Sequence, residues 1–82
     1  MKGSTGRCVI AVGSLTFAMK GQRLLGDQSI ASSVVRLHPS RTKRGCAYGI
    51  ELDCADVRKA TDLLSGSGIR YSEVIPADGE GF

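Results

Sequence analysis

The sequence predicts an α+β domain in which two helices cover one face of a four-stranded antiparallel sheet. Length sets the first limit, because 82 residues suffice for one small domain. Apolar runs with strand-like and helix-like spacing follow one another in the order β-α-β-β-α-β, separated by glycine, serine and proline. With right-handed crossovers, this order gives the ferredoxin-like split βαβ sandwich, in strand order 4-1-3-2.

The first strand and the first helix are predicted from the beginning of the chain. Residues 8–13 form a short run rich in β-branched side chains that stops at a glycine, as in a buried strand. Ser14 is a suitable N-cap for the helix that follows, and Gly26 stands where a C-cap usually does. A glycine on the apolar face would let this helix approach the sheet closely. That face consists of Phe17, Ala18, Gly21, Leu24 and Leu25.

Two further strands are predicted in the middle of the chain. Residues 29–38 form the second strand, which ends at Pro39 because proline cannot donate a hydrogen bond to a ladder. Residues 46–52 form the third strand, in which bulky residues alternate with small or polar ones. The bulky residues, which should face the helices, are Tyr48, Ile50 and Leu52.

The second helix and the fourth strand complete the pattern. Asp53 is predicted to cap a helix over residues 54–65, and residues 69–75 form the last strand. We assign the domain to residues 8–76, with residues 1–7 as a disordered lead-in and residues 77–82 as a flexible tail. The helix is expected to bury Val57, Ala60, Leu63 and Leu64.

The sheet face away from the helices has no predicted cover. Such an apolar surface favours sheet-to-sheet pairing in a homodimer. It is also the surface through which a non-enzymatic regulatory module would bind a small ligand or another protein. The residues expected there are Val9, Ala11, Val34, Ala47, Gly49 and Val74.

Composition and charge argue against several classes of partner. A net charge of +3 is too small by itself to indicate nucleic acid. Tyr48 and Tyr71 are predicted to face the helices, where they could not stack on bases. The sequence has neither an 18-residue apolar run nor an apolar stretch after Met1 like that of a secretory signal. We therefore expect no nucleic acid, no membrane association and a cytoplasmic location.

The chain has three cysteines, an odd number without the C-x-x-C spacing of metal sites. This count disfavours both a disulfide framework and a zinc site, so we expect neither a metal nor another cofactor. The sequence also lacks a plausible Ser/His/Asp set and a pair of oriented carboxylates. A carrier or binding protein therefore fits better than an enzyme.

Cys46 is the strongest candidate for chemistry, because it follows a basic loop and begins the third strand. A thiol reacts as its thiolate, and nearby cations stabilise that anion. Cys46 is therefore either a reactive carrier thiol or an inert cysteine beside a hairpin loop. In the first case, the residues that would bind the thiolate or an acidic partner are Arg41, Lys43, Arg44 and Gly45.

The other two cysteines and the single histidine are weaker candidates. We expect the first and third strands to run parallel, which would place Cys8 and Cys46 at the same edge of the sheet. Cys8 is then either a second thiol for Cys46 or a packing residue. Cys54 begins the second helix between two acids and is predicted to be incidental. His38 is either a proton carrier for Cys46 or an idle surface residue.

Residues 9–75 resemble the selenium/sulfur carrier protein-like family, small bacterial and archaeal domains of otherwise unknown function. This resemblance implies a thiol centre at Cys46. The chain departs from the family pattern at Ala47, where many members have glycine, and its own glycine comes later, at Gly49. Both residues therefore bear on the turn geometry. The segments that carry the resemblance are the apolar first strand before Ser14, Leu24-Leu25, Gly45-Cys46, Tyr48-Gly49-Ile50 and Ser67-Gly68-Ile69.

The resemblance and the basic loop together predict a sulfur or selenium carrier. Cys46 would accept a persulfide or selenopersulfide from a donor protein and pass it to an acceptor protein, without a cofactor. The alternative is the regulatory module that works through the open sheet face, with an unreactive Cys46.

Overall fold

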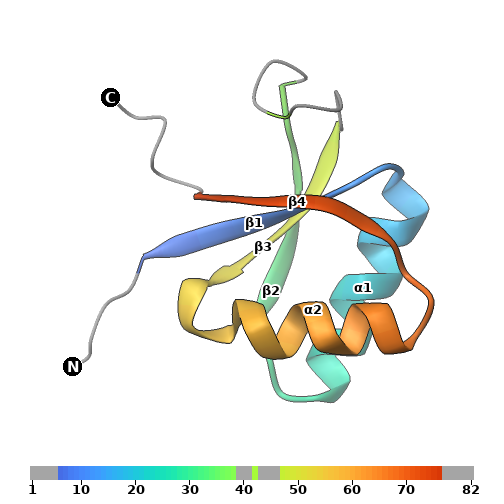
Figure 1. Cartoon of the computed structure of the whole chain (residues 1–82), viewed down its shortest axis with the longest axis vertical. Coiled ribbons are helices and arrows are strands. Elements are labelled where there is room, and N and C mark those ends of the chain that lie inside the picture. Colours follow the sequence, from blue (N-terminus) through green and yellow to red (C-terminus); the bar gives the residue numbers. More distant parts are fainter. Residues whose placement is uncertain (1–5, 39–41, 43–46, 77–82) are drawn as a thin grey trace.

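The computed structural model describes residues 6–38, 42 and 47–76, which form an α+β fold around one four-stranded antiparallel sheet. The sheet order β2-β3-β1-β4 is the predicted order counted from the other edge. In Figure 1, β4 runs across the view while β2 runs nearly vertically, which shows the strong twist of the sheet. The elements are β1 (Arg7–Val12), α1 (Leu15–Asp27), β2 (Ser32–Arg36), β3 (Tyr48–Asp53), the 3-10 turn η2 (Cys54–Asp56), α2 (Val57–Gly66) and β4 (Tyr71–Pro76).

All strand pairs are antiparallel, so the expected parallel pairing of the first and third strands is wrong. Cys8 lies opposite Leu52, and Val12 lies opposite Tyr48. The reason is the connectivity of the chain. The crossover through α1 makes β1 and β2 run the same way, and the direct connection to β3 reverses that strand against both. The start of β1 therefore meets the end of β3.

Local sequence explains where the helices begin and end. The Oγ of Ser14 accepts a hydrogen bond from the N–H of Phe17 at 3.2 Å, which confirms the predicted cap of α1. Asp53 caps η2 in the same way, since its Oδ1 accepts from the N–H of Ala55 at 3.0 Å. α1 continues past Gly26, where the sequence predicts its end. The chain turns away at Ser29, which has a left-handed φ of 64°.

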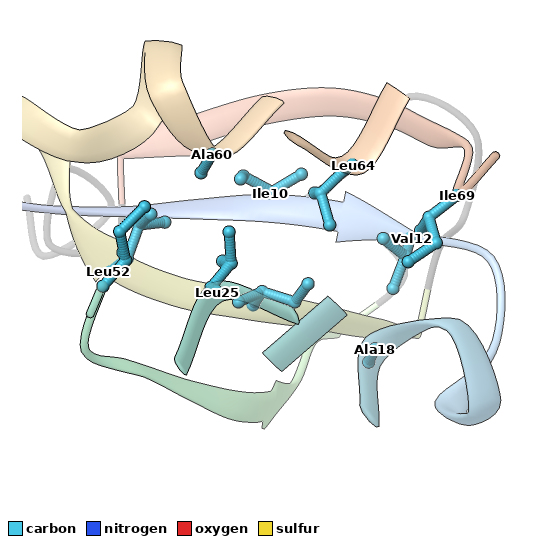
Figure 2. Packing of buried hydrophobic residues seen from close by; sticks show 10 residues of the cluster. Ile10, Val12, Ala18, Leu25, Leu52, Ala60, Leu64 and Ile69 are labelled. Carbon is cyan, nitrogen blue, oxygen red and sulfur yellow. The ribbon is translucent and has the colours of Figure 1, made fainter. Parts of the chain in front are cut away.

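The main core lies between the sheet and both helices (Figure 2). Gly21 allows the close approach predicted for α1, because a Cβ there would lie 2.5 Å from Ile50 Cδ1 and 3.0 Å from Leu64 Cδ2. Phe17 was expected on the buried face but is exposed, since it lies at the margin of the face centred on Ala18. Buried side chains from β1, β3, both helices and the segment before β4 meet here: Ile10, Val12, Ala18, Leu25, Ile50, Leu52, Ala60, Leu64 and Ile69.

The sheet also buries apolar side chains on the face away from the helices. Val9, Ala11 and Leu37 form a second cluster, with Val35 and Ile75 packed against it. Val9 is 2% exposed and Ala11 is fully buried, so these two residues do not form the open apolar surface that the sequence predicts.

Two other residues expected on that surface belong to the opposite face. Val34 packs against the helix-side core. Val74 lies opposite Ile10, and antiparallel partners present their side chains to the same side of a sheet. The sequence correctly predicts which residues of β3 face the helices. For Val34 in β2 and Val74 in β4, it predicts the wrong face of the sheet.

Gly49 is required by the packing of the second cluster. A Cβ at this position would collide with Val9 Cγ1, and it would lie 3.1 Å from Leu37 Cδ1 and 3.2 Å from the carbonyl oxygen of Ile10. The absence of a side chain therefore lets Val9 and Leu37 close over the beginning of β3.

The two predicted flanking segments lie largely outside the described residues. Residues 1–5 and 77–82 are not described. Arg7, however, is the first residue of β1, and the carbonyl of Gly6 accepts a hydrogen bond from the N–H of Cys54 at 3.0 Å. The last two residues of the predicted lead-in are thus part of the fold.

Candidate functional site

The antiparallel register brings the two described cysteines to one end of the sheet. Cys8 begins β1, and Cys54 directly follows β3. Cys46 is bonded to Ala47, which precedes β3. From residue 47 to residue 52, opposite Cys8, the distance along an antiparallel strand is roughly 17 Å. We call these regions the Cys8 end and the Ala47 end.

At the Cys8 end, Cys8 and Cys54 form a disulfide, with their Cα atoms 5.0 Å apart. The register explains the pairing, because Arg7 lies opposite Asp53 and the flanking cysteines come within bridging distance. This finding overturns the prediction against a disulfide and the view of Cys54 as incidental. Cys8 is bonded to Cys54 and lies beside the end of β3, opposite Leu52, rather than beside its beginning as the sequence predicts.

Strand direction is the sequence feature that would have identified this pair. In a β-α-β-β chain with a right-handed crossover, the first and third strands are antiparallel neighbours. The start of the first strand then lies beside the end of the third, where Cys54 stands. An odd number of cysteines excludes a fully paired set but leaves one pair allowed.

A second cross-strand link strengthens the Cys8 end. Arg7 Nε and Glu51 Oε2 form an ion pair at 3.4 Å, with side chains 45% and 31% exposed. Exposed pairs of this kind typically stabilise a fold by less than about 1 kcal/mol. The covalent bond is therefore the dominant side-chain link at this end.

At the Ala47 end, the predicted thiol site itself lies outside the described residues. The described residues on either side of it are hydrogen-bonded to each other. The N–H of Leu37 donates to the carbonyl of Ala47 at 2.7 Å, one residue beyond the paired ends of β2 and β3. His38 is exposed, whereas Thr42 is buried. The predicted site residues not described are Arg41, Lys43, Arg44, Gly45 and Cys46.

Two arginines lie at the Ala47 end. Arg36 lies opposite Tyr48, and Arg70 directly precedes β4, whose first residue lies opposite Val12. Both arginines are exposed, and the nearest described acid by register is Glu73, which lies opposite Ala11, the partner of Gly49. α1 also begins at this end, which adds the positive end of its dipole.

A shallow hollow of about 340 Å³ lies at the same end, between the end of α2 and the beginning of β4. It combines a cationic guanidinium with the ring of Tyr71, which is 37% exposed. Arginine and tyrosine are enriched in protein interfaces. The hollow is lined by Ser65, Gly68, Ile69, Arg70 and Tyr71.

Other kinds of site were sought in the same residues. Within the described ranges, no group of three or more His, Cys, Asp or Glu side chains could hold a metal ion. None of the described helices is both long and apolar enough to cross a membrane. Tyr48 packs against the helix-side core, as predicted.

Comparison with known proteins assigns the chain to a family. No curated protein and no solved structure matches it. A family model does match, over residues 7–76, and this range includes every helix and strand described above. By this match, the chain belongs to the family described as "Putative Se/S carrier protein-like".

Proposed function

We propose that this protein carries sulfur or selenium as a persulfide or selenopersulfide on Cys46 and passes it to a partner protein. The observation that carries the proposal is the Cys8–Cys54 disulfide. It uses two of the three cysteines of the sequence, so Cys46 is the cysteine left to act as the carrier thiol. The family name supplies the class of function, and the choice of residue is our inference.

The charges around the Ala47 end support this choice. Arg36, Arg70 and the beginning of α1 give that end a positive potential, to which the loop cations of the sequence add. Such a potential stabilises a thiolate and attracts an acidic partner surface. The loop residues to which we assign these roles are Arg41, Lys43, Arg44 and Gly45.

The transfer chemistry requires only a thiolate. The Cys46 thiolate attacks the outer sulfur of a donor persulfide, and a new S–S bond forms as the donor's own S–S bond breaks. The donor leaves as a thiolate, and the transferred sulfur remains on Cys46 as the outer atom of a persulfide. Delivery to the acceptor repeats the same exchange, so no oxidant, reductant or cofactor is consumed. A selenopersulfide would follow the same route.

Packing supports a role for Ala47 and Gly49 in holding this site. Ala47 is hydrogen-bonded to Leu37, and Gly49 lets Leu37 pack closely over β3. The two residues thus help to fix the beginning of β3 at Tyr48, two positions after Cys46 in the sequence. The element and strand order support assignment to the ferredoxin-like arrangement as well.

The alternative function, a regulatory module that uses the open sheet face, receives less support. Val9, Ala11 and Gly49 are buried within the single chain. The same burial weakens the case for a homodimer through this face. Donor and acceptor proteins remain the partners that we propose, and a cytoplasmic location remains our prediction.

Sulfur loading tests the proposal directly. The purified protein would be incubated with glutathione persulfide, and the mass of the intact chain and of its peptides would be measured. We expect one added sulfur atom on the peptide that contains Cys46, and loss of this product in the Cys46→Ser variant. The Cys8→Ser/Cys54→Ser double variant is the matched control and should still load. Equal loading of Cys46→Ser and the wild-type protein would refute the proposal.

A further inference from the structure

We infer that Cys8 and Cys54 form a second, separate sulfur site: a dithiol–disulfide pair that exchanges two electrons with a dithiol partner. This function is independent of the carrier chemistry proposed for Cys46. The inference rests on three features of the Cys8 end: the backbone bonds around the disulfide, its position outside the core, and its access to solvent.

Backbone bonds hold the two cysteines near each other without the disulfide. β1 and β3 remain paired at Arg7 and Asp53, and the N–H of Cys54 donates to the carbonyl of Gly6 at 3.0 Å. The two Cα atoms are 5.0 Å apart in this frame. After reduction, the thiols would therefore stay within reach of each other, and oxidation would be an intramolecular reaction at high effective concentration.

The disulfide lies outside the hydrophobic core. The fully buried side chains of the helix-side core include Ile10, Leu52 and Leu64, but neither cysteine. Breaking the bond thus opens no cavity in the core and leaves the sheet ladder intact. The reduced chain should keep its fold, which is the condition for a reversible redox pair rather than a bond needed only for folding.

Both cysteines keep part of their surface in contact with solvent. Cys8 and Cys54 are both half-buried, and each has an exposed neighbour on the chain, Arg7 and Ala55. The bond joins the first turn of η2 to the beginning of β1, near the surface of the sheet's end. In a reducing compartment, disulfides of this kind are usually catalytic or redox-sensing.

The exchange balances with a dithiol as the only co-reactant. One partner thiolate attacks a sulfur of the disulfide, which forms a mixed disulfide and releases the other cysteine as a thiolate. The second partner thiolate then attacks the mixed disulfide and releases the remaining cysteine. Two electrons and two protons end on Cys8 and Cys54, and the partner leaves as a disulfide.

The Cys46→Ser variant allows this pair to be tested alone. The folded protein would be equilibrated in buffers with stepped ratios of reduced to oxidised dithiothreitol, alkylated, and analysed by intact mass. We expect two species, with no label and with two labels, which interchange reversibly and share the same circular dichroism spectrum. Amide exchange over residues 54–58 should rise about tenfold on reduction, whereas exchange over residues 47–50 should change little.

A matched variant with one thiol serves as the control for complete labelling. Cys8→Ser, added to Cys46→Ser, leaves Cys54 as a single thiol that should be labelled at every ratio. Three results would overturn the inference: two labels even in fully oxidised buffer, resistance of the folded protein at every ratio, or unfolding on reduction. The last two would make the disulfide a purely structural bond.

Discussion

The two ends of this sheet differ in what a cysteine can do there. At the Cys8 end, the pairing of Arg7 with Asp53 brings the adjacent residues Cys8 and Cys54 close together, and their sulfurs bond to each other. At the Ala47 end, the described surroundings offer two cations, Arg36 and Arg70, and the nearest described acid by register is Glu73, opposite Ala11. Strand direction, rather than the number of cysteines, thus decides which cysteines can bond to each other.

Removal of the disulfide at the Cys8 end should have the largest effect on stability. The Cys8→Ser/Cys54→Ser variant should lose about 3 kcal/mol of unfolding free energy, because the disulfide closes a loop with a sequence separation of 46 residues. Urea denaturation followed by circular dichroism measures this loss. Cys46→Ser leaves the Cys8–Cys54 bond intact, so it is the control and should change stability much less. A double variant as stable as the wild type would show that the bond does not constrain the unfolded chain.

The second prediction concerns the close packing around Gly49, near the Ala47 end. Gly49→Ala should destabilise the fold by about 2 kcal/mol, because the added Cβ would press on Val9, Leu37 and the backbone of Ile10. Gly66→Ala is the matched control, since a Cβ there meets nothing within 4 Å. It should be neutral or stabilising by up to about 1 kcal/mol. Equal unfolding midpoints for the two variants in urea would contradict the close approach at Gly49.

Patterns within one element predicted the fold well. The alternation of β3 correctly placed Tyr48, Ile50 and Leu52 toward the helices, and Ser14 caps α1 as expected. Asp53 caps only the 3-10 turn η2, and α2 begins at Val57, so the single helix predicted over residues 54–65 is divided in two. These features depend on neighbours in the sequence, where spacing alone decides the outcome.

Relations between elements were harder to predict. The direction of β3 relative to β1 decides which cysteines lie close together. A parallel pairing was predicted, which would put Cys8 beside the beginning of β3, whereas the antiparallel pairing puts it beside the end. The phase of β4 likewise put Val74 on the helix side rather than the other face. Both depend on pairing between distant segments, which a run of apolar residues does not encode.

The smallest expected effect tests the electrostatics of the Ala47 end. In the Cys8→Ser/Cys54→Ser background, Cys46 is the only thiol, so its alkylation rate against pH reports its ionisation. Cations stabilise the thiolate and not the neutral thiol, so the midpoint should lie below the ~8.5 of a free cysteine. Added salt screens these charges and should raise the midpoint toward that value.

Single arginine variants test which end of the sheet carries the cations that lower the Cys46 midpoint. Arg36→Gln removes a cation close to the beginning of β3 and should raise the Cys46 midpoint by about 0.5 units, or about 0.7 kcal/mol. Arg58→Gln removes an equally exposed cation from the first turn of α2, toward the Cys8 end, and should leave the midpoint unchanged. Equal shifts in both variants would mean that only the net charge of the protein acts on Cys46. A shift confined to Arg36→Gln would instead locate the stabilising field at the Ala47 end, where the carrier chemistry requires it.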